Sequence, residues 1–427
     1  MKILLTGASG FIGQHLVAAL TKAGHTVVCA VRKPKPPGRG VSYISIDFNK
    51  ALSPLDWAAA VGGVDVVVNA VGILRESREQ KFDTIHRAAP CALFSAAANA
   101  GVKHIVQLSA LGADESATTG YHLSKKAADD FLLSLPVRAS IVQPSLVYGP
   151  GGASAALFEL FASMPLVLLP GGGRQQIQPV HINDLVQALH GLIMSVQGHS
   201  GRIAMVGPAP IALREFYGAL RKAMGLRKPW FVPVPMVFMR MAARMGKWLP
   251  GGFLDTDTLD MLERGNTASS DGISALLGRP PLSPDQFVAP AYARAVAIQA
   301  KMRWLLPALR LSVGAVWLAT GIVSLGLYPI EASYELLART GTPVMLMPLF
   351  LYGAAVLDIA LGILTVIPRR SRWLWAAQAA LVLVYTIIIS LKIPEFWLHP
   401  YGPILKNLPF LAGLWILYEL EDRAWTT

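Results

Sequence analysis

Four long apolar segments follow one another after residue 303, and they constrain the fold of this part of the chain more than any other feature. An α-helix rises about 1.5 Å per residue, so about 20 apolar residues cross the hydrocarbon core of a bilayer. Single buried helices can be equally apolar, but four in succession, joined by short polar loops, favour a transmembrane four-helix domain. The segments are residues 305–327, 344–367, 373–393 and 403–420.

The loop between the second and third segments carries Arg369, Arg370 and Arg372, and the other loops lack a comparable basic cluster. Basic loops stay on the cytoplasmic side of a membrane. Four spans return the chain to the side on which it began. We therefore predict a multi-pass protein of a bacterial-type inner (cell) membrane, with its N-terminal domain and C-terminus in the cytoplasm.

Two charged residues lie within these segments, Arg310 and Asp358. Charges at this depth usually face a partner or a cavity. We expect a structural Arg310–Asp358 pair rather than a proton or quinone site. Gly314 and Gly321, a heptad apart, are expected to let a neighbouring helix approach closely.

The first 300 residues alternate between strands and helices. Runs of Val and Ile that alternate with helices predict a parallel sheet covered on both faces, which is a doubly wound α/β fold of the Rossmann type. The expected strands are residues 2–6, 25–31, 64–70, 103–109 and 138–144, and the expected helices are 11–24, 81–101 and 121–135. We divide the chain into a nucleotide-binding domain (1–150), a substrate-side region (151–300) and a membrane domain (301–427).

The turn after the first strand reads "TGASGFIG" and contains Gly7, Gly10 and Gly13. Glycines between a strand and a helix permit a tight turn and close approach of the backbone to a pyrophosphate. Further along, Tyr121 and Lys125 are one helical turn apart and share a helix face. A neighbouring ammonium is expected to lower the pKa of the phenol, so that it exchanges protons near neutral pH.

The glycine turn and the Tyr121/Lys125 pair together resemble the short-chain dehydrogenase/reductase superfamily over roughly residues 1–290. The resemblance implies catalytic roles for Tyr121 and Lys125, with Ser109 as the candidate serine. It also implies contacts with a nicotinamide dinucleotide by Gly7, Ala8, Ser9, Gly10, Phe11, Ile12, Gly13, Arg32, Asp47, Phe48, Ala70, Val71, Gly72, Lys125, Pro144 and Val147.

Departures from the family pattern point to one branch of it. His86 and Gln143 stand where many extended members have asparagine and arginine, and Ala110 and Leu111 occupy the positions after Ser109. These features resemble the atypical branch that includes the nucleotide-binding accessory subunit of respiratory complex I. The four apolar segments resemble the DoxX-like membrane domains that are fused to such reductases.

Charge indicates which dinucleotide binds. Arg32 follows the second strand, where a carboxylate would hold the ribose hydroxyl of NAD. A cation suits the 2′-phosphate of NADP, so NADP(H) is favoured over NAD(H), although a solvated basic loop is the alternative.

Two parts of the substrate-side region leave alternatives open. In "PVHINDLVQAL" we expect Asn183 or Asp184 to cap a helix, and His181 and Asp184 have either a structural or a binding role. The helix expected in "VPVPMVFMRMAARMGKWLPGG", with Arg240, Arg244 and Lys247, either faces the core or lies on anionic lipid.

The formal charge of +12 suits anionic lipid and a phosphorylated cofactor, and no nucleic-acid motif accompanies it. Cys29 and Cys91 are expected to be buried thiols, and no metal site is expected. We predict a membrane-anchored oxidoreductase or epimerase whose small-molecule or lipid-like substrate is a quinone precursor, a sterol or a lipid-linked sugar. The alternative is a non-catalytic NADPH-bound scaffold or redox sensor with a respiratory or quinone-biosynthesis assembly as partner.

Overall fold

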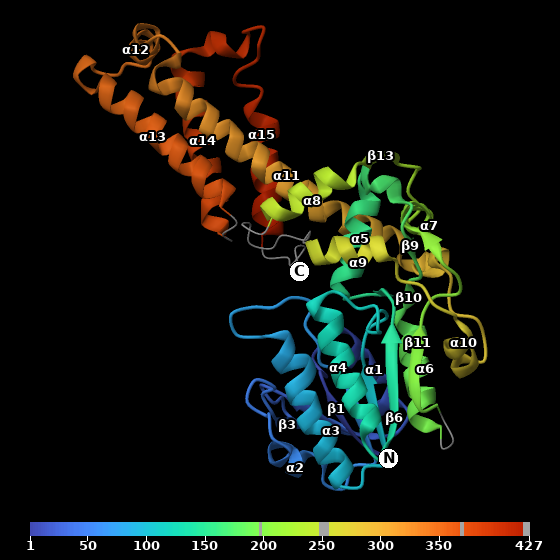
Figure 1. Cartoon of the computed structure of the whole chain (residues 1–427). Helices are drawn as coiled ribbons and strands as arrows, with labels where there is room; N and C mark the ends of the chain where they lie inside the picture. The colour runs from blue at the N-terminus through green and yellow to red at the C-terminus, as the bar shows by residue number, and fades with distance from the viewer. Residues whose placement is uncertain (196–198, 247–255, 368–370, 422–427) are drawn as a thin grey trace. The chain divides into compact units, whose positions relative to one another are not determined.

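The computed structural model in Figure 1 describes residues 1–195, 199–246, 256–367 and 371–421. The chain divides into two compact units, Met1–Ala297 and Ile298–Thr427. The first contains the predicted strand–helix alternation, and the second contains most of the apolar C-terminal sequence.

A seven-stranded parallel sheet forms the centre of the first unit, in the order β11-β6-β5-β4-β1-β2-β3. The predicted doubly wound fold is confirmed, and the strand order reverses between β1 and β4. β3 and β11 extend the sheet at its two edges beyond the five predicted strands. The strands are β1 (Lys2–Thr6), β2 (Thr26–Val31), β3 (Val41–Ser45), β4 (Val66–Asn69), β5 (His104–Leu108), β6 (Arg138–Pro144) and β11 (Gly201–Met205).

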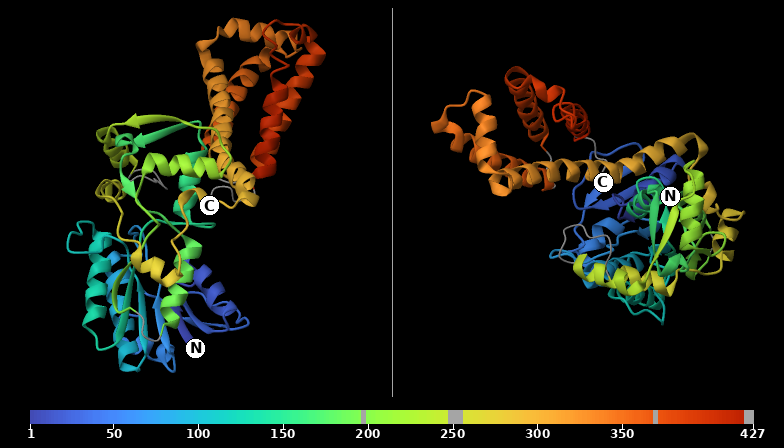
Figure 2. Two further views of the ribbon diagram at one scale, coloured as in Figure 1. Left: turned by 90° about the vertical axis from the view of Figure 1, so that its right-hand side faces the viewer. Right: turned by 90° about the horizontal axis from the view of Figure 1, so that it is seen from above.

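Helices cover both faces of this sheet (Figures 1 and 2). Alternate strand residues point to opposite faces, so Ile3 and Leu5 join one core and Leu4 joins the other. The first face packs against α1 (Phe11–Lys22), α6 (Ile182–Met194) and α10 (Asp271–Leu277). The second packs against α2 (Ala58–Val61), α3 (Ala89–Asn99) and α4 (Gly120–Ser134).

The rest of the first unit lies beyond the carboxyl ends of the strands. Buried Arg221 holds part of it together, because its guanidinium donates to the carbonyl oxygens of Met164 and Arg227, each at 2.7 Å, and to that of Ala162. The helices are α5 (Ala153–Ser163), α7 (Leu213–Ala223), α8 (Met236–Gly246) and α9 (Thr256–Arg264). The strand pairs are β7 (Val147–Tyr148) with β10 (Val180–His181), β9 (Gln176–Ile177) with β12 (Ile211–Ala212), and β8 (Leu166–Pro170) with β13 (Trp230–Val234).

The second unit is helical. Its helices are α11 (Ala293–Ile322, which begins in the first unit), α12 (Ile330–Arg339), α13 (Met347–Val366), α14 (Arg372–Lys392) and α15 (Asn407–Leu420). Among the described residues, three helical segments are long and apolar enough to cross a membrane: Pro290–Leu327, Val344–Val366 and Arg372–Lys392.

The fourth predicted span is shorter than expected. α15 has 14 residues, because the helix begins at Asn407 rather than at residue 403. At about 1.5 Å per residue this helix is about 21 Å long, less than the hydrocarbon core. Arg369 and Arg370, on which the predicted orientation depends, lie outside the described residues, so the side of the membrane stays a prediction.

The predicted Arg310–Asp358 pair is wrong. Arg310 donates to the carbonyl oxygens of Thr365 and Ile367, both at 2.6 Å, and its guanidinium stacks over Trp375. These carbonyls end α13 and have no partner within their helix, so they attract a cation. Asp358 is buried, and within the described parts of the chain it makes no ion pair.

The close helix approach predicted at Gly314 and Gly321 is confirmed. A Cβ added to Gly321 would lie 2.6 Å from Ile359 Cγ1 and 2.8 Å from the Ala355 carbonyl oxygen. At Gly314 it would lie 2.9 Å from Val366 Cγ2. Small residues therefore let α11 and α13 pack at short range.

We expect Gly321→Val to destabilise this unit. The added side chain meets α13 backbone, which cannot move aside, and overpacking of this kind typically costs about 1–3 kcal/mol. Gly353→Val on α13 is the matched control, because nothing lies within 4 Å of a Cβ there. Thermal unfolding in detergent should show a lower Tm for Gly321→Val alone. Equal Tm values for the two variants would contradict the close packing.

Candidate functional site

The glycine turn between β1 and α1 has the shape of an anion-binding loop. Gly7 has φ of 69°, and a Cβ there would lie 2.5 Å from the Ala70 carbonyl oxygen. A Cβ on Gly13 would lie 2.1 Å from the Gly7 carbonyl oxygen. Gly10 is the N-cap of α1, which has neither a side-chain cap nor an acidic residue in its first turn. The first amides of α1 thus remain to bind a phosphate, and exposed Ser9 and Gly10 fit a pyrophosphate.

The other predicted cofactor residues follow the ends of parallel strands, so they lie at one edge of the sheet. Arg32 follows β2 and is exposed, and Asp47 follows β3, where its carboxylate accepts from the Asn49 amide at 3.0 Å. Phe48 is buried against Trp57, with ring centroids 5.2 Å apart. Ala70, Val71 and Gly72 follow β4, Pro144 ends β6, and Val147 lies in β7.

Lys125 on α4 reaches into this edge. Its side chain is buried, and Nζ donates to the carbonyl oxygens of Leu108 at 3.0 Å and Val71 at 3.2 Å. A Cβ on Gly72 would come within 3.1 Å of Nζ, so a larger residue there would crowd the ammonium. Burial lowers the pKa of Lys125, and the carboxylate of Asp129 raises it. The ammonium is therefore held between the ends of β4 and β5.

Tyr121 lies one turn before Lys125 and is enclosed by aromatic rings. The centroids of Phe82, His86 and His122 lie 6.0, 5.4 and 5.2 Å from its ring, each in an edge arrangement. Burial, and then the charge of Asp129, raise the pKa of Tyr121 to about 12. The expected lowering of this pKa by Lys125 is therefore wrong for this arrangement, because burial and the Asp129 carboxylate both disfavour the phenolate.

Ser109 donates its hydroxyl hydrogen to Asp129, which is fully buried. Burial raises the pKa of Asp129, while the Ser109 hydrogen bond and Lys125 lower it. Sequence reasoning missed Asp129. The available signal was its position four residues after Lys125, on the same face of α4. The carboxylate accepts a hydrogen bond from the candidate serine and acts on the candidate lysine through its charge.

His86 lies in a π-helical turn, Asp83–Ala88, a distortion that is frequent at functional sites. Its Nε2 accepts from the Ile73 amide at 3.0 Å, which assigns the hydrogen to Nδ1, 2.9 Å from Ser124 Oγ. Burial, and then the charge of Lys125, lower the pKa of His86 to about 3. This neutral ring positions the loop after β4 beside Tyr121.

The residues at the start of α6 make structural contacts, and no observation tests the binding role that was the alternative for His181 and Asp184. His181, rather than Asn183 or Asp184, is the N-cap, and its Nδ1 accepts from the Asn183 amide at 3.2 Å. Buried Asp184 accepts from Arg279 at 2.5 Å and from the Leu282 amide at 2.7 Å. Asp184 thus fastens the chain after α10 to the first turn of α6. The two cysteines are free, with Cys29 buried and Cys91 half-buried.

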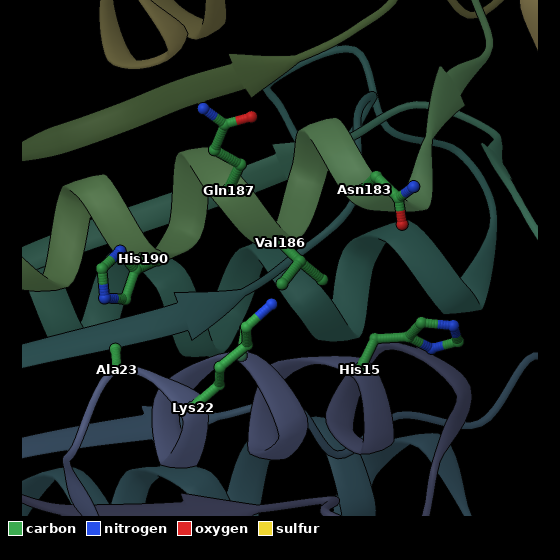
Figure 3. Close-up of a pocket in the computed structure, with 8 residues that line it drawn as sticks. His15, Lys22, Ala23, Asn183, Val186, Gln187 and His190 are labelled. Carbon is green, nitrogen blue, oxygen red and sulfur yellow. The ribbon is translucent and has the colours of Figure 1, made fainter.

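A surface groove of about 430 Å³ lies between α1 and α6 (Figure 3). Its lining includes His15 and Lys22 from α1 and Asn183, Gln187 and His190 from α6. None of the predicted cofactor or catalytic residues contributes to it. The groove is separate from the strand-end site.

Comparisons with known proteins match both parts of the chain to families. Residues 3–207 match the NAD dependent epimerase/dehydratase family, and residues 314–415 match the DoxX-like family. The two matches cover different parts of the chain. Such an epimerase/dehydratase domain supports a nicotinamide cofactor, and the DoxX-like domain with its apolar helices supports a membrane location.

Two curated relatives resemble the first unit. A ceramide reductase of Caulobacter vibrioides is 29% identical over 189 residues, which are 44% of this chain and 59% of the relative. The mitochondrial NADH dehydrogenase [ubiquinone] 1 alpha subcomplex subunit 9 of Arabidopsis thaliana is 24% identical over 249 residues, 56% of this chain and 61% of the relative. The match thus spans about three fifths of each relative. The predicted resemblance to the complex I subunit is confirmed.

Solved structures share the epimerase/dehydratase fold. A nucleoside-diphosphate-sugar epimerase from Staphylococcus aureus is 19% identical, with a TM-score of 0.55, and the match covers 67% of this chain and 99% of that chain. UDP-glucuronic acid 4-epimerase from Bacillus cereus, in complex with UDP-glucuronic acid and NAD, is 18% identical with a TM-score of 0.52, covering 69% of this chain and 100% of that chain. At sequence identities of 19% and 18%, these similarities show a shared fold alone.

Proposed function

We propose that the protein is a membrane-anchored, NADPH-dependent oxidoreductase that acts on a lipid-soluble or membrane-presented substrate. The observation that carries this proposal is the position of buried Lys125, one turn from Tyr121 and hydrogen-bonded to the ends of β4 and β5. The glycine turn after β1 opens at the same edge of the sheet. Family membership and the DoxX-like domain support a nicotinamide reaction near a bilayer.

Tyr121 is proposed as the proton donor. A bound nicotinamide supplies or accepts the hydride of the reaction. The Tyr121 phenol holds its proton at neutral pH and can donate it to a substrate oxygen, as carbonyl reduction requires, although burial, which raises its pKa to about 12, makes it a weaker acid. Lys125 directs two of its three N–H bonds at main-chain carbonyls and retains a donor for a ribose hydroxyl. Epimerisation, the activity of several structural neighbours, uses the same residues in both directions.

Arg32 is proposed to select NADPH over NADH. Losing one charge-assisted contact with a phosphate costs about 1.5–3 kcal/mol, or about ten- to a hundredfold in affinity. We therefore expect Arg32→Ala to weaken NADPH binding by that factor and to leave NADH binding unchanged. Thermal stabilisation by each dinucleotide measures the preference. Arg39→Ala, which removes another exposed cation from the same loop, is the matched control.

Equal stabilisation of the unaltered protein by NADH and NADPH would contradict this assignment. An unchanged preference in Arg32→Ala would contradict it as well. If Arg39→Ala loses the preference for NADPH over NADH and Arg32→Ala keeps it, then the later part of the loop binds the 2′-phosphate.

The substrate class is proposed from the membrane domain and from one relative. A reductase held at a bilayer meets lipid-soluble carbonyl compounds at high local concentration. The ceramide reductase relative adds a sphingolipid to the predicted quinone precursor, sterol and lipid-linked sugar. NADPH oxidation by the full chain in nanodiscs, tested with separate lipid classes, would identify the class that is reduced.

A second candidate function is a non-catalytic NADPH-bound scaffold in a respiratory or quinone-biosynthesis assembly. The observation that favours it is the Ser109 hydroxyl, which donates to Asp129 instead of remaining free to donate to a substrate oxygen. Ala110 and Leu111 provide no replacement hydroxyl. The complex I subunit is the corresponding relative.

A further inference from the structure

Large apolar side chains gather on the outer surface of β8, β13 and α8. Figures 1 and 2 place β13 and α8 at the end of the first unit opposite the N-terminus. Trp230 is 78% exposed and Phe238 is 61% exposed. We call this surface the β13–α8 patch, and its exposed members are Leu166, Leu168, Trp230, Val237, Phe238 and Met241. Exposed large apolar side chains that are grouped on neighbouring elements mark an interaction site.

The two strands present an apolar outer face. β8 and β13 pair in parallel, with Trp230 beside Leu166 and Val232 beside Leu168. Residues in register share a face of a sheet, and alternate residues point to the opposite face. Leu166 and Leu168 are therefore outward, while the intervening Val167 is buried. Both faces of this pair are apolar, and in the described part of the chain only the inner one is covered.

α8 also presents an exposed apolar face. Val237, Phe238 and Met241 lie on one face by their spacing, and Ala243 lies on the opposite face, where it is buried. Arg240, between these faces, pairs with Glu263 at 2.5 Å and Asp260 at 3.2 Å on α9. This ion pair keeps the outer face turned away from α9. A helix that is apolar on both sides is usually buried or in contact with a membrane.

Cations border the patch. Arg227 and Lys228 are exposed and precede Trp230 by three and two residues. Tryptophan concentrates at the headgroup level of bilayers, and long basic side chains reach the anionic headgroups from there. Each Lys or Arg near such a surface raises affinity by about fivefold. An aromatic ring with adjacent cations thus fits a lipid surface better than the apolar interior of another protein.

We propose that the β13–α8 patch docks on the surface of the bilayer that holds the C-terminal helices, with Arg227 and Lys228 against anionic headgroups. Three of the described helices of the same chain are long and apolar enough to cross a membrane, so a bilayer is always within reach of the first unit. Tethering gives this surface an advantage in effective concentration over any free partner. The net charge of +12 is complementary to anionic lipid. The proposal is independent of the reaction that the protein catalyses.

Fluorescence quenching by lipid tests the proposal directly. The full chain, with Cys29 and Cys91 replaced by alanine, is labelled with nitrobenzoxadiazole through Met241→Cys and placed in nanodiscs containing phosphatidylglycerol and nitroxide-labelled acyl chains. Leu55→Cys, at a position that is 84% exposed and outside the patch, is the matched control. We expect the label at position 241 to lose most of its fluorescence and the label at position 55 to lose none.

Several results would overturn the proposal. Equal quenching at positions 241 and 55 would show that the patch does not touch lipid. Protection of the position 241 label from soluble iodide without quenching by lipid would show that protein covers the patch, either a second copy or another part of this chain. Unchanged quenching in Arg227→Glu/Lys228→Glu, or in purely phosphatidylcholine nanodiscs, would refute the role given to the two cations.

Discussion

Tyr121→Phe should reduce turnover by about a hundredfold or more, the usual contribution of a positioned general acid. The substitution removes only the phenolic oxygen, and the ring keeps its edge contacts with Phe82, His86 and His122. Within the described residues that oxygen makes no hydrogen bond, so its removal leaves no buried partner unsatisfied. Stability and NADPH affinity should therefore remain close to those of the unaltered protein.

The measurement combines steady-state NADPH oxidation, NADPH affinity and complementation of a deletion strain. A catalytic Tyr121 requires that the variant binds NADPH but fails in both activity and rescue. Full rescue by Tyr121→Phe would contradict the catalytic role and favour the scaffold. Lost NADPH affinity in this variant would instead show that the hydroxyl serves binding.

Gly7→Ala should abolish dinucleotide binding, an effect of more than about a hundredfold if two charge-assisted contacts with phosphate are lost. At φ of 69° a Cβ costs about 1–2 kcal/mol in backbone strain. It would also lie 2.5 Å from the Ala70 carbonyl oxygen and 2.9 Å from the Val71 amide nitrogen. The turn would have to leave the end of β4, which would displace the first amides of α1.

Gly24→Ala is a control that introduces backbone strain without the steric contact that a Cβ on Gly7 would make with the end of β4. Gly24 has φ of 83°, and nothing lies within 4 Å of a Cβ there. Both variants should lose similar stability from strain, but Gly24→Ala should bind NADPH normally. Isothermal titration with NADPH and thermal unfolding without it measure the two effects. Normal binding by Gly7→Ala would contradict the placement of the dinucleotide at this turn.

The sequence predicted the nucleotide-binding architecture because its signals are local. Val and Ile runs, glycines at a turn and a Tyr–Lys spacing of one helical turn are visible within short windows. Edge strands were harder, since "VSYIS" at residues 41–45 and "GRIAM" at residues 201–205 lack the continuous apolar pattern of β4. Their pairing depends on neighbours that are distant in the sequence.

The electrostatics of the site could not be read from spacing. Lys125 is four residues from both Tyr121 and Asp129, and only the three-dimensional arrangement shows that burial and Asp129 dominate the pKa of the phenol. Similarly, the sequence offered Asp358 in the next apolar segment as a partner for Arg310. In the structure, Arg310 donates instead to the main-chain carbonyls at the end of α13. Main-chain acceptors at helix ends carry no sequence signature.

We propose that this chain uses NADPH to reduce a membrane lipid through Tyr121. The most direct test is NADPH oxidation by the full-length protein in nanodiscs, with a native membrane lipid extract added under anaerobic conditions and with Tyr121→Phe alongside. We expect NADPH consumption that depends on both the extract and Tyr121, together with a reduced lipid product. Tight NADPH binding without consumption in any lipid fraction would contradict it.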